Sequence, residues 1–249
     1  MKMTLTILTV LIISSTVPQT VSAGGKSVTY KVGAEEYEGY YVSSPPGAPL
    51  ILLIHDWDGL TDYEVKRSAM LAELGYAVFA VDLFGKGVRP AELDDKRRLT
   101  GELYKDRAKM RRLLNGAIDE AKPLGGDTDN AVAIGYCFGG SAVLELARAG
   151  ANLKGFVTFH GGLETPVGED YSRTNGKVLV FHGSADESVS MDNFAQLAKE
   201  LEENKINHEM ITYSGAPHAF TIFGSGRYRE DADKKSWKRF KAFLSETLK

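Results

Sequence analysis

Short aliphatic segments alternate with amphipathic ones along most of this chain of 249 residues. Residues 50–54 are entirely aliphatic, and residues 64–74 then show helical periodicity that ends at Gly75. An aliphatic run of this length is typical of a strand covered on both faces, and its alternation with helices predicts repeated strand–helix–strand units. We therefore expect one α/β domain with a mostly parallel sheet of about eight strands and helices on both faces.

The same patterns predict the individual elements. The strands are expected at residues 27–32, 37–42, 50–54, 76–81, 131–134, 155–159, 177–181 and 209–213. The helices are expected at residues 64–74, 105–121, 141–148, 191–204 and 232–248. The first two strands are predicted to form an antiparallel edge hairpin, and the charged runs at 94–98 and 229–235 to be solvated faces. Because ligands bind beyond the carboxyl ends of parallel strands, functional residues are expected there.

Composition limits the classes of partner. The chain has 33 acidic and 30 basic residues, hence a formal net charge of −3, and 43% of its residues are hydrophobic. A balance this close to neutral gives no electrostatic reason to expect nucleic acid or an anionic membrane surface as a partner. The sequence also lacks HExxH, paired-cysteine and P-loop motifs, so we expect neither a metal nor a cofactor.

The N-terminal segment predicts export. Lys2 precedes an apolar run over residues 5–13, which is too short to cross a bilayer, and small residues precede Gly24. This pattern is typical of a secretory signal peptide, the alternative being a buried N-terminal strand or helix. We expect residues 1–23 to be removed and residues 24–249 to form the single mature domain. The protein would then be periplasmic or secreted, without membrane association.

Gly135 and Gly139 flank Cys137 between a predicted buried strand and a predicted helix. This is the spacing of a nucleophile elbow, a turn so sharp that larger side chains at the two glycine positions would collide with neighbouring backbone. Such a turn places the sulfur beside a helix N-terminus, which favours negative charge. Cys137 is the only cysteine, so it forms no internal disulfide. The alternative to a reactive thiol is a small buried thiol in a glycine-rich turn.

A nucleophilic thiol needs a base, and the base needs an orienting partner. After a nucleophile elbow, the acid and then the histidine follow in chain order. Asp186 comes after the strand at 177–181, and His218 after the strand at 209–213, so both are predicted members of a catalytic triad. Three of the remaining histidines are expected to be structural: His55, His160 and His182. The fourth, His208, is expected to face solvent.

Backbone N–H groups are predicted to bind the oxyanion of the reaction. One is the N–H of Phe138, the residue after the nucleophile. The second should come from the loop after the strand at 50–54, where Trp57 is the predicted donor.

These motifs together resemble the dienelactone hydrolase family of α/β-hydrolases, from about Tyr37 to Leu244. The resemblance rests on five motifs in order, at residues 55–60, 82–87, 135–140, 182–186 and 217–220. It implies an α/β-hydrolase fold without a large lid. It also implies that the triad hydrolyses a small-molecule ester or lactone through an acyl-thioenzyme.

The resemblance implies further roles, with two departures from the family pattern. An acidic residue contacts the resting thiol in this family; it is commonly Glu, and here the matching residue is Asp56. Lys86 stands in the motif where dienelactone-specific members carry a substrate-binding Arg. Those members have a second Arg four residues after the catalytic histidine, and this chain has Ile222. Since Lys does not reproduce the bidentate geometry of Arg, we expect a substrate other than dienelactone.

Two other functions remain open from the sequence. One is a non-catalytic hydrolase fold that binds a small ligand or a partner protein. The other is a thiol redox protein that uses Cys137 with an external thiol, since the chain has no resolving cysteine.

Overall fold

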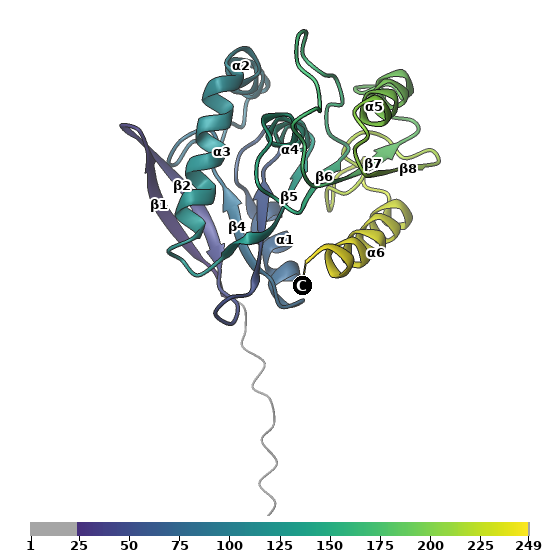
Figure 1. Cartoon of the computed structure of the whole chain (residues 1–249). Helices are drawn as coiled ribbons and strands as arrows, with labels where there is room; N and C mark the ends of the chain where they lie inside the picture. The colour runs from purple at the N-terminus through teal and green to yellow at the C-terminus, as the bar shows by residue number, and fades with distance from the viewer. Residues whose placement is uncertain (1–23, 249) are drawn as a thin grey trace, which may run out of the picture.

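The structure is a computed structural model that describes residues 24–248 (Figure 1). Within these residues, one eight-stranded sheet has the order β1-β2-β4-β3-β5-β6-β7-β8. β2 pairs antiparallel with β1 and with β4, and every other neighbouring pair is parallel. The predicted mostly parallel α/β architecture and its antiparallel edge hairpin are therefore confirmed. The predicted leader, residues 1–23, lies outside the described residues.

The strands have the following bounds: β1 (Lys26–Val32), β2 (Glu35–Val42), β3 (Pro49–Ile54), β4 (Ala77–Val81), β5 (Asp127–Tyr136), β6 (Gly155–Phe159), β7 (Lys177–Gly183) and β8 (His208–Tyr213). The helices are α1 (Asp62–Ala72), α2 (Leu93–Lys105), α3 (Arg107–Ala121), α4 (Phe138–Ala149), α5 (Met191–Glu203) and α6 (Glu230–Thr247).

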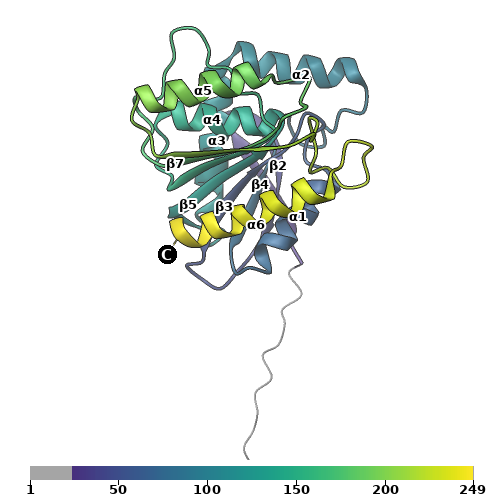
Figure 2. The ribbon, with the colours of Figure 1, turned by 90° about the vertical axis from the view of Figure 1, so that its right-hand side faces the viewer.

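The sheet is covered on both faces. Figure 2 shows α1 and α6 against one face and α2, α3, α4 and α5 on the other. Alternate residues of β3 belong to the two hydrophobic cores: Leu50 and Leu52 pack on the side of α3 and α4, whereas Ile51 and Leu53 pack on the side of α1 and α6. The uninterrupted aliphatic run of this strand is thus explained by burial on both faces.

The structure corrects the prediction for the charged segment before residue 105. Residues 94–98 are mostly exposed, as predicted for a solvated face, but they lie in α2, a helix that the sequence analysis did not predict. A second helix, α3, begins at Arg107, since the side chain of Asp106 accepts a hydrogen bond from the Lys109 N–H at 2.7 Å and caps it. The helix predicted over residues 105–121 therefore begins two residues later than expected, and a separate helix, α2, precedes it. The polar composition of α2 concealed it.

The turn between β5 and α4 is as sharp as the glycine spacing predicts. Cys137 has a φ of 49°, in the left-handed region that non-glycine residues rarely adopt. A Cβ atom on Gly135 would lie 2.1 Å from the Gly139 carbonyl oxygen, and one on Gly139 would lie 2.3 Å from the Ile54 carbonyl oxygen. The Cys137 N–H donates to the Phe159 carbonyl at 3.0 Å, which ties the turn to β6. Only glycine fits at the two flanking positions.

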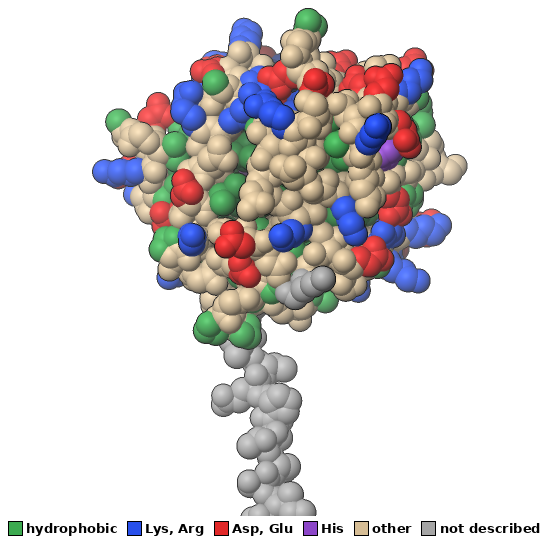
Figure 3. Space-filling model, viewed as in Figure 1, with side chains coloured by type: hydrophobic (Ala, Val, Ile, Leu, Met, Phe, Trp, Pro, Cys, Tyr) green, Lys and Arg blue, Asp and Glu red, His purple; other side chains and the backbone are tan. Residues whose placement is uncertain are grey.

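Charged side chains of both signs are interspersed over the face of the molecule shown in Figure 3. No helix among residues 24–248 is long and apolar enough to cross a bilayer.

We predict that Gly135→Ala destabilises the fold by about 2 kcal/mol or more, because the added methyl group meets backbone that cannot move aside. Gly101 is a matched control, since it lies in α2 and a Cβ there meets no atom within 4 Å. Gly101→Ala should stabilise the protein by roughly 0.5–1 kcal/mol. Urea unfolding of both variants measures the difference, and equal unfolding midpoints would contradict the steric account of the turn.

Candidate active site

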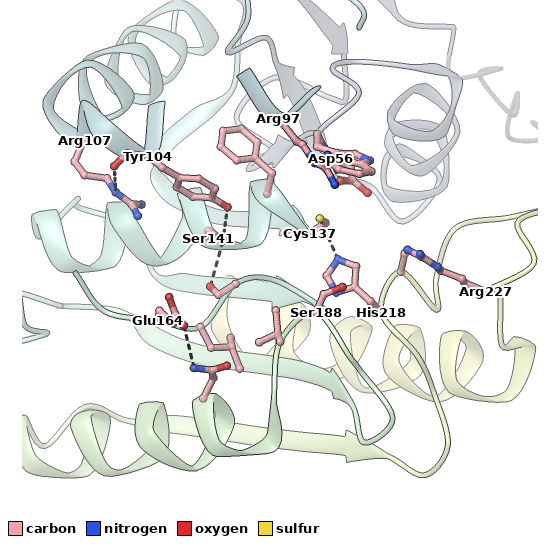
Figure 4. A pocket seen from close by; sticks show the side chains of 17 residues that line it. Asp56, Arg97, Tyr104, Arg107, Cys137, Ser141, Glu164, Ser188, His218 and Arg227 are labelled. Carbon is pink, nitrogen blue, oxygen red and sulfur yellow. Dashed lines mark hydrogen bonds between the residues drawn. The ribbon is translucent and has the colours of Figure 1, made fainter. Parts of the chain in front are cut away.

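Three predicted residues meet beyond the carboxyl ends of β5, β7 and β8. The Sγ atom of Cys137 lies 3.1 Å from Nε2 of His218, and Nδ1 of His218 lies 2.8 Å from Oδ2 of Asp186 (Figure 4). The three residues are 32 or more positions apart in the sequence, and the parallel register of the strands brings them to one edge of the sheet. This is the geometry of a nucleophile, a base and an orienting acid.

Asp186 is held firmly as an acceptor. Its Oδ1 atom accepts hydrogen bonds from the backbone N–H groups of Ser188 at 2.8 Å and Val189 at 2.9 Å. Although burial would raise it, the hydrogen bond with His218 and these N–H groups hold the pKa of Asp186 below its ordinary value. An ionised Asp186 keeps the proton of His218 on Nδ1 and leaves Nε2 free to accept one from the thiol.

Cys137 is half-buried and uncharged at neutral pH. Burial raises the pKa of Cys137 well above the ordinary thiol value, and the nearby carboxyl group of Asp56, which accepts a hydrogen bond from the thiol, raises it further. The Phe138 N–H interacts with the sulfur and opposes this shift, as expected at the N-terminus of α4. Cys137 therefore rests as a thiol, and its proton would have to be removed before the sulfur could act as a nucleophile.

Asp56 binds two of the predicted catalytic groups at once. Besides the thiol of Cys137, its Oδ1 atom accepts the backbone N–H of Trp57 at 2.5 Å. Burial raises the pKa of Asp56 to about 6, against the lowering effect of these two hydrogen bonds. The predicted thiol contact of Asp56 is thus present in the structure, and the same carboxyl group covers the N–H that was predicted as the second oxyanion donor.

His55 fixes the peptide group that carries this N–H. Its Nδ1 atom lies 2.5 Å from the Asp56 carbonyl oxygen, and its Nε2 atom accepts the Leu83 N–H at 3.1 Å. In a trans peptide the C=O and N–H point in opposite directions, so holding the Asp56 carbonyl also fixes the direction of the Trp57 N–H. His55 is fully buried, and both of its ring nitrogens are used in structural contacts.

The other histidines lie apart from the thiol. His160 bonds Thr221 through Nε2 at 2.8 Å, and the ring of His182 stacks on Phe194. His208 is half-buried at the start of β8, where its Nδ1 atom lies 2.8 Å from the Ile206 carbonyl oxygen. Among the described residues, His218 is the only histidine that forms a hydrogen bond with the Cys137 sulfur.

A cavity of about 720 Å³ opens over Cys137 and His218. Phe138, Leu163 and Val189 contribute apolar surface to it, and the Tyr104 hydroxyl donates to Ser141 Oγ at 3.1 Å on one wall. Three arginines also line it: Arg97, Arg107 and Arg227. Figure 4 shows Arg107 near one end of the cavity and Arg227 beside His218. The cavity can therefore hold a small molecule with an apolar part and an anionic group.

The structure does not bring every expected residue to this cavity. Lys86 lines a separate hollow and forms an ion pair with Glu36 at 3.7 Å, and Ile222 is likewise absent from the lining. The sequence analysis missed Arg97 and Tyr104, which are seven residues apart and so lie on one face of α2. That spacing was a usable signal, but it required recognition of α2 as a helix. Arg227 lies in an irregular loop and carried no such signal.

Among residues 24–248, no three His, Cys, Asp or Glu side chains are grouped so that they could hold a metal ion.

Comparisons with known proteins identify the family of the chain. Residues 38–248 match the dienelactone hydrolase family. "Protein usf" of Aquifex pyrophilus is 26% identical over 237 residues, which cover 90% of this chain and 99% of that protein. A protein of Aquifex aeolicus (strain VF5) named "Putative carboxymethylenebutenolidase" is 26% identical over 204 residues, covering 79% of this chain and 87% of its own.

Two solved structures are similar to this one, each with a TM-score of 0.84. In each case the matched region covers 91% of this chain and 99% of the chain in the solved structure. One is m3DLH, at 32% identity. The other, at 30% identity, is a dienelactone hydrolase-like promiscuous phosphotriesterase from metagenomic libraries.

We predict that Asp56→Asn stabilises the protein more at pH 8 than at pH 4.5. The pKa of Asp56 is raised to about 6 in the folded protein, so the folded state binds this proton more tightly than the unfolded state. Stability from this group is therefore present at low pH and is lost as pH rises from about 4 to 6, by up to about 3 kcal/mol. Asparagine has no charge to desolvate and avoids this loss.

Thermal unfolding at the two pH values measures the effect. Asp129→Asn, at an exposed position, is the control and should show no such pH-dependent gain. An equal gain from Asp56→Asn at both pH values would contradict the raised pKa.

Proposed function

Since the chain belongs to the dienelactone hydrolase family, we propose that it hydrolyses a small ester or lactone with Cys137 as nucleophile, His218 as base and Asp186 as orienting acid. The observation that carries this proposal is the continuous contact from Sγ through the imidazole to the carboxylate, at 3.1 Å and 2.8 Å. A thiol that rests protonated needs such a base within hydrogen-bond reach.

In the first half of the reaction, Nε2 of His218 takes the thiol proton and Sγ attacks the carbonyl carbon. The carbonyl oxygen becomes an oxyanion, which the N–H groups of Phe138 and Trp57 stabilise. Loss of one such donor costs about 3–4 kcal/mol of barrier in comparable sites. The imidazolium then gives its proton to the leaving alkoxide, and an acyl-thioenzyme remains.

Asp56 has to release both of its partners before this step. Its carboxyl group accepts hydrogen bonds from the Trp57 N–H and from the thiol of Cys137. The substrate oxygen takes over the hydrogen bond from the Trp57 N–H, and His218 takes over the hydrogen bond from the thiol. Binding of a carbonyl group in the oxyanion site is thereby coupled to release of the nucleophile.

In the second half, water attacks the thioester. His218 again acts as the base and takes a proton from this water, while the same two N–H groups hold the second oxyanion. Collapse of this intermediate breaks the C–S bond, releases the carboxylic acid and returns the proton to the thiol.

The cavity supports a substrate with negative charge near the reacting group. Arg97 and Arg227 are exposed and have no ion-pair partner among the described residues, whereas Glu164 is the one acidic lining residue besides Asp56. The apolar wall at Phe138 and Leu163 suits the carbon skeleton of the ester or lactone.

The hydrolase proposal also fits the chemistry of the sulfur better than a redox role does. Peroxide reacts with thiolates, and burial raises the pKa of Cys137 well above its ordinary value. A passive binding protein would not need the base and acid that are aligned on the thiol.

We also propose that the protein acts outside the cytoplasm, as a periplasmic or secreted enzyme whose mature chain begins at Gly24. This proposal rests on the signal-peptide pattern of residues 1–23. N-terminal sequencing of the exported protein would test it, and an intact Met1 on protein recovered from the cytoplasm alone would contradict it.

The nucleophile is tested by hydrolysis of a panel of short aryl esters and lactones, to which an aryl phosphotriester is added because of the similar phosphotriesterase. We expect Cys137→Ala to lower kcat by at least about 1,000-fold, since the reaction loses its covalent step. Mass spectrometry should detect one acyl group on the wild-type protein and none on the variant.

Turnover that survives in Cys137→Ala would mean that another residue is the nucleophile. Absence of turnover in both proteins would favour the binding or redox alternatives. Loss of one thiol per chain under peroxide would then support the redox alternative.

We predict that Arg227→Gln raises the KM for an ester that carries a carboxylate by about three- to tenfold and leaves the KM for a neutral ester unchanged. Arg98→Gln is the control, since Arg98 is exposed on α2, pairs with Asp95 and Glu102, and does not line the cavity. Equal effects of Arg227→Gln on both esters would show that its charge does not select the substrate.

A further inference from the structure

A second histidine lies directly behind the proposed base. His160 follows β6, is fully buried, and packs its ring against that of His218 with the centroids 5.5 Å apart and the planes at 66°. Its φ of 42° is in the left-handed region, which is unfavourable for a non-glycine residue. The reaction proposed above gives this residue no role.

A chain of hydrogen bonds, buried except at the half-buried Tyr63, connects His160 with an ion pair between α1 and α6. Nε2 of His160 lies 2.8 Å from Oγ1 of Thr221, which lies 2.8 Å from the Tyr63 hydroxyl. That hydroxyl accepts from Nε of Arg67 at 3.1 Å. Arg67 in turn binds Asp233 at 2.5 Å and donates to the Thr221 carbonyl at 3.1 Å.

The donor groups give this chain a direction. A guanidinium only donates, so the Tyr63 oxygen accepts from Arg67 and its hydrogen bonds Thr221 Oγ1. In this direction Thr221 donates its own hydrogen to Nε2 of His160, which is then the unprotonated ring nitrogen. In the opposite direction Thr221 would donate to Tyr63, and the Tyr63 hydrogen would have to turn to the neighbouring Tyr136 hydroxyl.

Thr221 also anchors the loop that carries the base. It lies three residues after His218, and Ala219 between them has a φ of 61°. A residue held in this region costs of order 1–3 kcal/mol, so the loop keeps its shape only if other contacts fix it. The buried side chain and carbonyl of Thr221 supply three such contacts, to His160, Tyr63 and Arg67.

We propose that Thr221 and His160 are positioning residues for His218: the hydrogen-bond chain from Arg67 keeps His160 a neutral imidazole with its proton on Nδ1, and the ring of His160 holds that of His218 so that Nε2 faces Cys137. The inference rests on the proposed function, since it assumes that His218 is the base. A neutral neighbour also adds no charge repulsion when His218 becomes an imidazolium.

The surroundings of His160 fit a neutral ring. Burial holds the pKa of His160 well below its ordinary value, and His218 lowers it further. Ionisable side chains approach it from four elements or loops: Tyr63 and Arg67 from α1, Tyr136 from β5, Asp186 from the loop after β7, and His218 from the loop after β8.

The kinetic test compares Thr221→Val, which removes the hydroxyl, with Thr221→Ser, which keeps it. We expect Thr221→Val to lower kcat by roughly ten- to a hundredfold with KM within about twofold of wild type, because the base is misplaced but the cavity is intact. Thr221→Ser should recover most of the rate. Thr174→Val is the matched control: it removes another buried hydroxyl, which bonds the Ala147 carbonyl at 2.8 Å, and should leave kcat unchanged even if it lowers Tm.

A spectroscopic test does not depend on turnover. Two-bond ¹H–¹⁵N NMR spectra of the histidine rings should show His160 in wild type as the neutral form with the proton on Nδ1. Tyr63→Phe interrupts the chain one link earlier, so it should give a mixture of the two neutral forms even if Thr221→Val fails to fold.

The outcomes separate the two proposals. If wild type hydrolyses esters and Thr221→Val matches it, or if His160 carries its proton on Nε2, the inference is overturned and the proposed function stands. If wild type hydrolyses nothing in the panel, the proposed function fails and the positioning role fails with it, whichever form His160 takes.

Discussion

Steric exclusion at the turn after β5 is the constraint on which the rest of the site depends. Gly135 and Gly139 approach backbone so closely that neither tolerates a Cβ atom, and Cys137 between them adopts a left-handed conformation. Backbone strain of this kind persists only where surrounding structure fixes it, and here the parallel neighbour β6 accepts the Cys137 N–H. The sulfur therefore projects above the sheet at a point that the strand register decides, and the base and acid need only reach that point.

The loop after β3 carries a carboxyl group that contacts both the sulfur and a backbone N–H group of the site. The carboxyl group of Asp56 reaches back to the N–H of the next residue as well as to the thiol. His55 holds the peptide group between Asp56 and Trp57 in place through its contact with the Asp56 carbonyl oxygen, and the Leu83 N–H in turn holds the ring of His55. A single side chain thus contacts the proposed oxyanion donor and the proposed nucleophile at the same time.

Much of this arrangement could be predicted from the sequence, for reasons that are local or topological. The glycine spacing around Cys137 specifies the elbow, and parallel strands place Asp186 and His218 at the same edge. The helix α2 was missed because its polar composition resembles a solvated run, and with it the cavity residue Arg97. The partner of the Trp57 N–H and the hydrogen bonds of His160 were out of reach, since both depend on side-chain directions between segments far apart in the sequence.

The order of the strands also has a consequence for how the protein is made. The proposed nucleophile, acid and base follow β5, β7 and β8, so the proposed base comes after the last strand that joins the sheet in chain order. During translation Cys137 is added to the chain about eighty residues before His218, its proposed base. A nascent or truncated chain that ends before His218 therefore carries the sulfur without its histidine neighbour, and the contact between Sγ and Nε2 forms only when the C-terminal quarter of the domain has folded.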